Sequence, residues 1–246
     1  MKIKIAIVDA RIDAAMERAL MLRGFRVITL PPFSRLSEAV ASHTDMLICR
    51  IDNEYISYAD YCEEASYVFT DLSQLLTAGG ARLSFTADEV KAEYPNDCRL
   101  NALFMGDKLF CRQETASPYM LERAREAGYT VIPTKQGYPA CTVMRLNDES
   151  AITADRGMAK ILTENGIRVT LIENGGIDLP PHEYGFIGGS GGVYDGALYL
   201  FGSLDSHTSA DVIRQAAERE GLRIVCLGDA TLRDLGGIIF AECDIH

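Results

Sequence analysis

The stretch RGFRVITL, from Arg23 to Leu30, decides the fold, because close copies of it recur along the chain. Each copy has a glycine at its second position, followed by a run rich in apolar and β-branched residues. A glycine can end a helix in the left-handed conformation, and the run after it is typical of a buried strand. The further copies are AGYTVIPT (Ala127 to Thr134), NGIRVTLI (Asn165 to Ile172), EGLRIVCL (Glu220 to Leu227) and a degraded GGARLSFT (Gly79 to Thr86).

The residues ahead of each copy form a pattern as well. Apolar side chains recur there at helical spacing, as Ala159 and Leu162 do ahead of Gly166. Further upstream, short β-rich runs adjoin polar turns of the kind that hairpins select. These blocks are Asp45 to Tyr58, Arg99 to Arg112, Cys141 to Thr153 and Gly196 to Leu204. The repeat therefore predicts a unit of strand, strand, helix and strand.

The two ends of the chain supply the remaining unit. The segment from Leu235 to Ile245 and the opening segment from Lys2 to Asp9 both read as strands. Pairing them in one sheet would close a ring of five units and remove exposed sheet edges. No Pro- or Ser-rich linker interrupts the chain. We therefore predict one domain over residues 1–246, an α/β propeller of five ββαβ units with pseudo-five-fold symmetry.

An ordinary doubly wound α/β domain is the alternative, because the opening of the chain reads as strand, helix and strand. That fold commonly carries a glycine-rich dinucleotide fingerprint after its first strand. Here Asp9, Ala10 and Arg11 follow Val8, so the fingerprint is missing. The sequence argues against a dinucleotide site.

Composition narrows the class of protein further. Apolar residues make up 48% of 246 residues, enough for a large core, and the net charge of -11 disfavours nucleic-acid binding. No apolar run is long enough for a membrane span, and charges appear too early for a signal peptide. We expect a cytoplasmic protein with no nucleic-acid or membrane partner; the sequence does not indicate an oligomeric state.

The seven cysteines are an odd number and include no C-x-x-C pair. Disulfides are therefore not expected. No His and Cys spacing along the chain matches a zinc motif. The sequence predicts neither a structural metal nor a cofactor.

Four segments carry a family resemblance: QGYPACT (from Gln136), ITADRGMAKIL (from Ile152), IENGGIDLP (from Ile172) and GFIGGSGG (from Gly185). Together with the repeat, they resemble a bacterial branch of the pentein superfamily, distantly similar to dimethylarginine dimethylaminohydrolase and arginine deiminase. The resemblance implies the five-unit propeller and a central ligand site. In those enzymes a Cys nucleophile, a His and carboxylates act on a guanidinium group.

In direct register with the deiminases, the catalytic pair is missing. Phe240 or Ala241 stands where the Cys should be, and Gly185 or Phe186 where the His should be. Neither Phe nor Gly can perform nucleophilic or acid–base work. The first functional prediction is therefore a pentein that binds a small polar or guanidine- or amidine-like ligand in the central channel without deiminase-type catalysis.

A second register rotates the ring. GYPACTV, from Gly137, resembles the deiminase Cys motif, and SHTDMLIC, from Ser42, resembles its His-x-Asp. This register makes Cys141 a candidate nucleophile, His43 a general acid or base, and Asp45 a group that orients His43 or binds guanidinium. The alternative function is a Cys-dependent hydrolase of C–N bonds other than peptide bonds, or an amidinotransferase. A buried strand cysteine and a histidine at a helix end are the plain alternatives for Cys141 and His43.

Other candidate ligand contacts lie where the ring fold would turn strand ends toward the centre. Asp9 and Arg11 end the first strand, and Asn101 lies in a strand; surface placement is the alternative for all three. Gly188, Gly189 and Ser190 belong to a glycine-rich loop whose backbone N–H groups can face a ligand. Ser190 also satisfies G-x-S-x-G, but a serine nucleophile elbow needs a following helix, and a strand is expected there.

Overall fold

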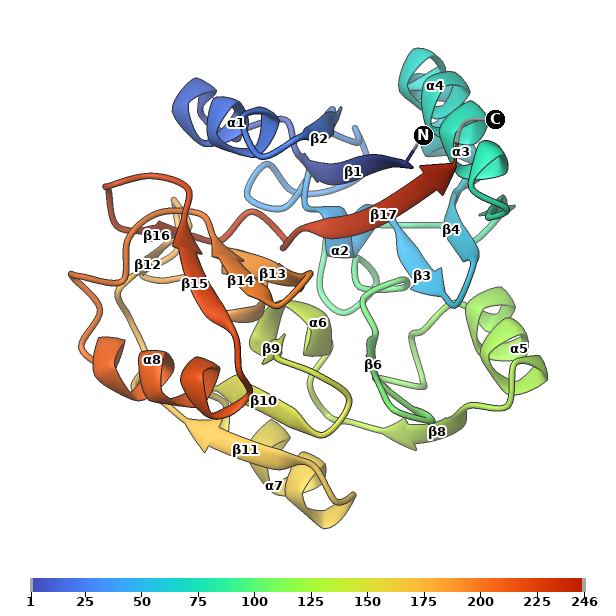
Figure 1. Ribbon diagram of the computed structural model, residues 1–246. Helices are drawn as coiled ribbons and strands as arrows, with labels where there is room; N and C mark the ends of the chain where they lie inside the picture. Colours follow the sequence, from blue (N-terminus) through green and yellow to red (C-terminus); the bar gives the residue numbers. More distant parts are fainter. Residues whose placement is uncertain (1, 245–246) are drawn as a thin grey trace.

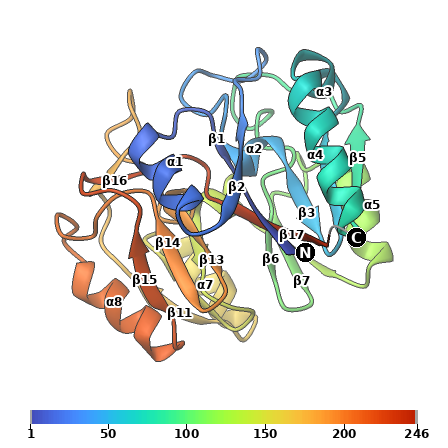
Figure 2. The same cartoon turned by 45° about the horizontal axis from the view of Figure 1, so that its top comes forward.

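The computed structural model describes residues 2–244 and arranges five three-stranded sheets around a common centre (Figure 1). In each sheet the first and second strands are antiparallel, and the third strand runs parallel to the second. The helix of each unit connects its second and third strands and lies on the periphery (Figures 1 and 2). This is the five-unit α/β propeller that the repeat predicted.

The units are numbered here from the one that holds both chain ends. Unit 1 consists of β17 (Ile239–Asp244), β1 (Lys2–Asp9), α1 (Ala14–Met21) and β2 (Phe25–Leu30). Unit 2 consists of β3 (Cys49–Ile51), β4 (Glu54–Tyr58), α3 (Ala59–Glu64), α4 (Ser66–Ala78) and β5 (Arg82–Thr86). Unit 3 consists of β6 (Leu103–Met105), β7 (Lys108–Cys111), α5 (Pro118–Glu126) and β8 (Thr130–Pro133).

The other two units follow in the same order along the chain. Unit 4 consists of β9 (Val143–Arg145), β10 (Ser150–Thr153), α7 (Arg156–Glu164) and β11 (Arg168–Leu171). Unit 5 consists of β13 (Gly191–Tyr194), β14 (Ala197–Leu200), α8 (Ala210–Arg219) and β15 (Arg223–Cys226). Outside the units lie α2 (Thr44–Leu47), α6 (Pro139–Thr142), the short helix η1 (Gly188–Ser190), and the parallel pair β12 (Ile177–Asp178) and β16 (Leu232–Arg233).

The two ends of the chain share one sheet. β1 pairs with β17 in antiparallel register, from Lys2 opposite Asp244 to Ile7 opposite Ile239. Ile245, the last residue of the predicted terminal strand, lies outside the described residues. This pairing gives unit 1 the same strand arrangement as the four units that are continuous in sequence.

The middle strand of each sheet is largely buried because a strand flanks it on both sides. β4, β10 and β14 are buried along their whole length, and β1 is buried from Ile5 to Asp9. The glycines of the repeat perform the role predicted for them: Gly24, Gly128, Gly166 and Gly221 have φ values between 69° and 90° where each helix ends.

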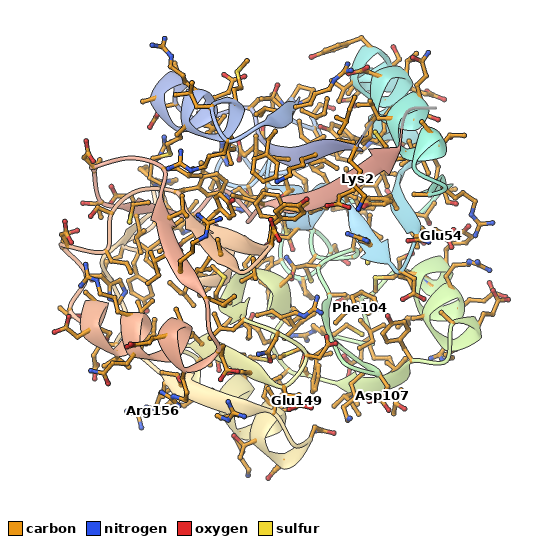
Figure 3. The ribbon with its side chains drawn as sticks, viewed as in Figure 1. Lys2, Glu54, Phe104, Asp107, Glu149 and Arg156 are labelled. Carbon is orange, nitrogen blue, oxygen red and sulfur yellow. The ribbon has the colours of Figure 1, made fainter. Side chains whose placement is uncertain are left out.

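Neighbouring units are joined by polar contacts as well as apolar ones. Glu54 at the start of β4 is buried between units 2 and 3 and is labelled in Figure 3. Its carboxylate accepts a hydrogen bond from Nε of Arg123 on α5 at 2.9 Å and pairs with Arg82 at 2.7 Å. Burial favours the neutral acid, but hydrogen bonds from Ser84, Arg82 and Arg123 outweigh it and lower the pKa of Glu54 to about 2.

Two predicted strand starts are helical instead. Asp45 belongs to α2 and Cys141 to α6, each just ahead of the first strand of its unit. Pro139 suits the first position of α6 because it lacks an N–H and has its φ fixed at a helical value. The interpretation of Cys141 as a strand cysteine is therefore wrong, although its burial is confirmed. Among residues 2–244, no helix is both long and apolar enough to cross a membrane.

Candidate functional site

Five short segments meet at the centre of the ring, one ahead of the first strand of each unit. The contacts among them are backbone and side-chain hydrogen bonds, such as Asp45 N to Gly236 O at 3.1 Å and Leu235 N to Gly189 O at 2.9 Å. The polar and glycine residues that they bring to the centre are His43, Asp45, Asn101, Cys141, Gly188, Gly189, Asp234 and Gly236. Pseudosymmetry thus places side chains from distant parts of the sequence in one cluster.

The core of this cluster is His43, Asp45 and Cys141. One ligand atom of each residue, a ring nitrogen, a carboxylate oxygen and the sulfur, lies within 4.8 Å of the other two. His43 precedes unit 2 and Cys141 precedes unit 4, so they are separated by two units along the ring. The structure therefore brings together the three residues that the rotated register selected; their catalytic roles stay predictions.

His43 is held as a neutral imidazole. Its side chain is buried, and Nδ1 lies 3.8 Å from Oδ1 of Asp234. Burial, and then the positive charge of Arg11, lower the pKa of His43 from 6.5 to about 3. Neither ring nitrogen has a hydrogen-bond partner among the described residues.

Asp45 contributes an unpaired carboxyl group. Both of its oxygens are buried, and neither makes a hydrogen bond of ordinary geometry with residues 2–244, although Cys141 and Asn101 lie near enough to act against the rise in its pKa. Burial, and then the negative charge of Asp234, raise the pKa of Asp45 well above its usual value. Buried polar atoms are normally paired, so four unpaired atoms on adjacent His43 and Asp45 mark the cluster as incomplete without a ligand, ion or water.

Cys141 is a thiol with one protein donor nearby. The side-chain Nδ2 of Asn101 donates to Sγ at 3.2 Å, and the side-chain Oδ1 of Asn101 accepts from the Ala140 N–H at 2.9 Å. Burial, and then the charges of Asp45 and Asp234, raise the pKa of Cys141 well above 9. An activated cysteine nucleophile needs the opposite shift, so this environment does not supply a thiolate by itself.

Asp9 and Arg11 form an ion pair beside the cluster. Arg11 donates to Asp9 from Nε at 3.0 Å and from Nη2 at 2.5 Å, and its Nη1 donates to the backbone carbonyl groups of Glu38 and Ala39. Asp9 and Asn101 are buried, so surface placement is wrong for both of them. The predicted placement of Asn101 in a strand is wrong as well, because β6 begins only at Leu103, and β1 ends at Asp9, ahead of Arg11. Arg11 is half-buried, and its charge acts on His43.

Sequence reasoning missed Asp234. Its carboxylate accepts from the Phe186 N–H at 2.8 Å and the Gly236 N–H at 3.1 Å, and burial raises its pKa to about 6. The signal that could have found it is the repeat. Asp234 stands shortly before the first strand of unit 1, much as His43 stands before that of unit 2.

The glycine-rich loop is packed rather than open. A Cβ on Gly188 would clash with the Ala140 carbonyl oxygen, and one on Gly189 with the Asp234 carboxylate. Ser190 is buried and donates from Oγ to the Phe186 carbonyl at 2.9 Å. A strand follows Ser190, as predicted, so it is not placed as a nucleophile elbow. Ligand binding by these three residues stays a prediction.

A cavity of about 670 Å³ opens on one side of the cluster. The first strands of all five units line it, among them Phe104 of β6, which is labelled in Figure 3. Asp45 and Gly188 are the predicted site residues that line this cavity. Its outer part carries mixed charge from residues that include Arg50, Asp52, Arg145 and Asp148.

Comparison with known proteins supports the architecture. The model of a family described as "Family of unknown function (DUF6873)" matches residues 7–239. No curated protein matches the sequence.

Solved structures match over most of the chain. A mutant dimethylarginine dimethylaminohydrolase from Pseudomonas aeruginosa, complexed with citrulline, is 13% identical over 91% of this chain and 90% of its own, with a TM-score of 0.54. An inosamine-phosphate amidinotransferase from Streptomyces griseus is 14% identical over 92% and 78%, with a TM-score of 0.51. Agmatine deiminase from C. jejuni is 10% identical over 92% and 75%, with a TM-score of 0.52. At these identities the likeness shows the fold, and the predicted pentein fold is confirmed.

Proposed function

The chain belongs to the family described as "Family of unknown function (DUF6873)", and from its own site we propose that it binds a small polar molecule of the guanidine or amidine class in the central cavity, without deiminase-type catalysis. The observation that carries this proposal is the buried carboxyl group of Asp45, a residue that lines that cavity, because neither of its oxygens has a hydrogen-bond partner among residues 2–244. Burial raises the pKa of Asp45, but a bound planar cation would favour its ionised form, and two parallel N–H donors can satisfy both oxygens of a carboxylate at once. The cavity volume is in the range of small-molecule sites.

Two positions argue against the chemistry of the deiminases in direct register. Phe240 lies in an aromatic cluster with Phe25, Tyr194 and Tyr199, with ring centroids 5.1–5.3 Å apart, and so serves packing. A Cβ on Gly185 would clash with Cβ of Asp234, so no histidine fits there. His43 and Cys141, which the second register selects, do not replace the missing Cys and His in this structure, because Cys141 is a thiol with a raised pKa.

The test is a binding titration of metal-free protein, kept in chelator, with methylguanidine and with acetamidine. We expect saturable binding, and we expect Asp45→Asn to weaken it by at least about tenfold, because a hydrogen bond to a charged partner contributes about 1.5–3 kcal/mol. Asp148→Asn is the matched control, since it removes a carboxylate from the same cavity but keeps Asp45. Equal affinity in the Asp45→Asn variant, or no binding by the wild type, would contradict the proposal.

A second candidate is the Cys-dependent hydrolase or amidinotransferase, favoured by the convergence of His43, Asp45 and Cys141. In that reaction Cys141 gives its proton to His43 and adds to the amidine carbon, and His43 returns the proton to the departing amine. Water, or an acceptor amine, then releases the product and restores the thiol. Two results would favour this candidate over simple binding. The protein would release amine from an amidine substrate, and Cys141→Ser would stop that release. Iodoacetamide would alkylate Cys141 faster than it alkylates buried Cys49 and Cys111.

A further inference from the structure

We propose that His43, Asp45 and Cys141 form a binding site for one divalent transition-metal ion of the zinc class. The proposal goes beyond the binding function above, because it holds whether or not the cavity takes an organic ligand. The sequence predicted no metal site from the spacing of His and Cys along the chain. That spacing is uninformative here, since His43 and Cys141 come from units 2 and 4 and meet only through the ring.

The donor set fits zinc by type and by distance. Imidazole nitrogen, thiolate sulfur and carboxylate oxygen are its three ordinary protein ligands. Zinc bonds of about 2.0–2.3 Å in a tetrahedron place ligand atoms about 3.3–3.8 Å apart. The three atoms lie within 4.8 Å of one another, so binding requires an approach of at most about 1.5 Å.

The unpaired atoms are a second, independent observation. Both nitrogens of His43 and both oxygens of Asp45 are buried, and none has a hydrogen-bond partner among the described residues. A metal ion would use one atom from each of these side chains. The remaining carboxylate oxygen of Asp45 would stay available to a ligand in the cavity.

Charge balance favours a divalent ion over an empty cluster with ionised ligands. A thiolate and a carboxylate together carry two negative charges, and neutral imidazole adds none. Burying such charges without a partner is costly, and a divalent cation neutralises them. A monovalent cation would leave a net charge in the buried cluster.

The surrounding residues form the supporting shell that metal sites usually have. Asp234 lies 3.8 Å from Nδ1 of His43, which leaves Nε2 as the nitrogen for the metal. The Asn101 amide already donates to the sulfur of Cys141. The backbone of α2 is fixed by Asp45 N to Gly236 O at 3.1 Å and by the Thr44 hydroxyl to Gly237 O at 2.9 Å. Three protein ligands leave a fourth position for water or a ligand atom.

The experiment is titration of chelator-treated full-length protein with Co²⁺, followed by competition with Zn²⁺. We expect one Co²⁺ per chain, visible d–d bands of a tetrahedral site, and a near-ultraviolet sulfur-to-cobalt charge-transfer band that Zn²⁺ removes. Cys141→Ser should abolish the charge-transfer band. His43→Gln and Asp45→Asn should weaken binding, and Asp234→Asn should weaken it about 10–100-fold, as loss of a supporting carboxylate does elsewhere.

Cys62→Ser is the control, because Cys62 is half-buried on α3 and is no part of the cluster. Circular dichroism establishes that each variant is folded. If Cys141→Ser does not fold, the folded Asp45→Asn and Asp234→Asn variants decide. The proposal is overturned if wild-type protein shows no charge-transfer band, if Cys62→Ser loses it, or if the cluster variants bind like the wild type. The methylguanidine titration is run without metal, so the two proposals fail separately. Absence of metal binding would not contradict the binding of methylguanidine, and absence of methylguanidine binding would not contradict the metal site.

Discussion

Replacing Gly236 by alanine is expected to lower the free energy of unfolding by roughly 2–5 kcal/mol. Gly236 has a φ of 70°, and a left-handed conformation costs an alanine about 1–2 kcal/mol. A Cβ there would also lie 2.5 Å from Cβ of His43 and 2.7 Å from the Thr44 nitrogen, both on the segment that carries the site. Such overpacking costs about 1–3 kcal/mol more. Urea denaturation at neutral pH measures the sum.

Gly24→Ala is the matched comparison. Gly24 has a φ of 86°, yet a Cβ there meets no atom within 4 Å. Its substitution should cost only the backbone strain, about 1–2 kcal/mol. If the two variants lose the same stability, the contact between Gly236 and His43 adds no cost, and the backbone conformation alone explains the need for glycine.

Truncating Phe240 to alanine is expected to cost about 3–5 kcal/mol, as the loss of a buried phenylalanine usually does. Phe240 on β17 contacts Phe25 of unit 1 and Tyr194 and Tyr199 of unit 5, and so joins two units. A drop in the urea midpoint at unchanged m-value would register this loss.

Phe85→Ala serves as the control, because Phe85 is more than a third exposed. It should lose less than half as much stability. A Phe240→Cys variant should be destabilised too and should gain no activity on methylguanidine, because Phe240, although it lines the cavity, packs among aromatic rings and is no part of the cluster of His43, Asp45 and Cys141. A stable Phe240→Ala protein would contradict that assignment.

The fold could be predicted from the repeat, because each unit carries the same local sequence pattern: a glycine that ends the helix and an apolar run that forms the next strand. Gly24, Gly128 and Gly166 end helices in the left-handed conformation, and the apolar runs after them form strands. These signals are local, so they can be read without knowing what lies across the ring.

The centre of the ring was predictable only in part. His43, Asp45 and Cys141 could be selected because short motifs surround them, but the unpaired state of His43 and Asp45 depends on contacts from other units. Asp234 has no motif of its own in the sequence. Asp234 lies near His43 because the segment before β17 contacts the segment before β3. No local pattern in the sequence predicts that contact.

The five short segments that meet at the centre of the ring have a consequence for how such proteins diversify. The segments before the first strands of units 1 to 4 each bring a polar side chain to the cluster, namely Asp234, His43, Asn101 and Cys141, although these residues lie far apart in the sequence. A reactive side chain lost from one of these segments can therefore be regained on another without a change of fold. Comparing related sequences column by column then misjudges which residues correspond, and equivalence has to be assigned by angular position about the axis.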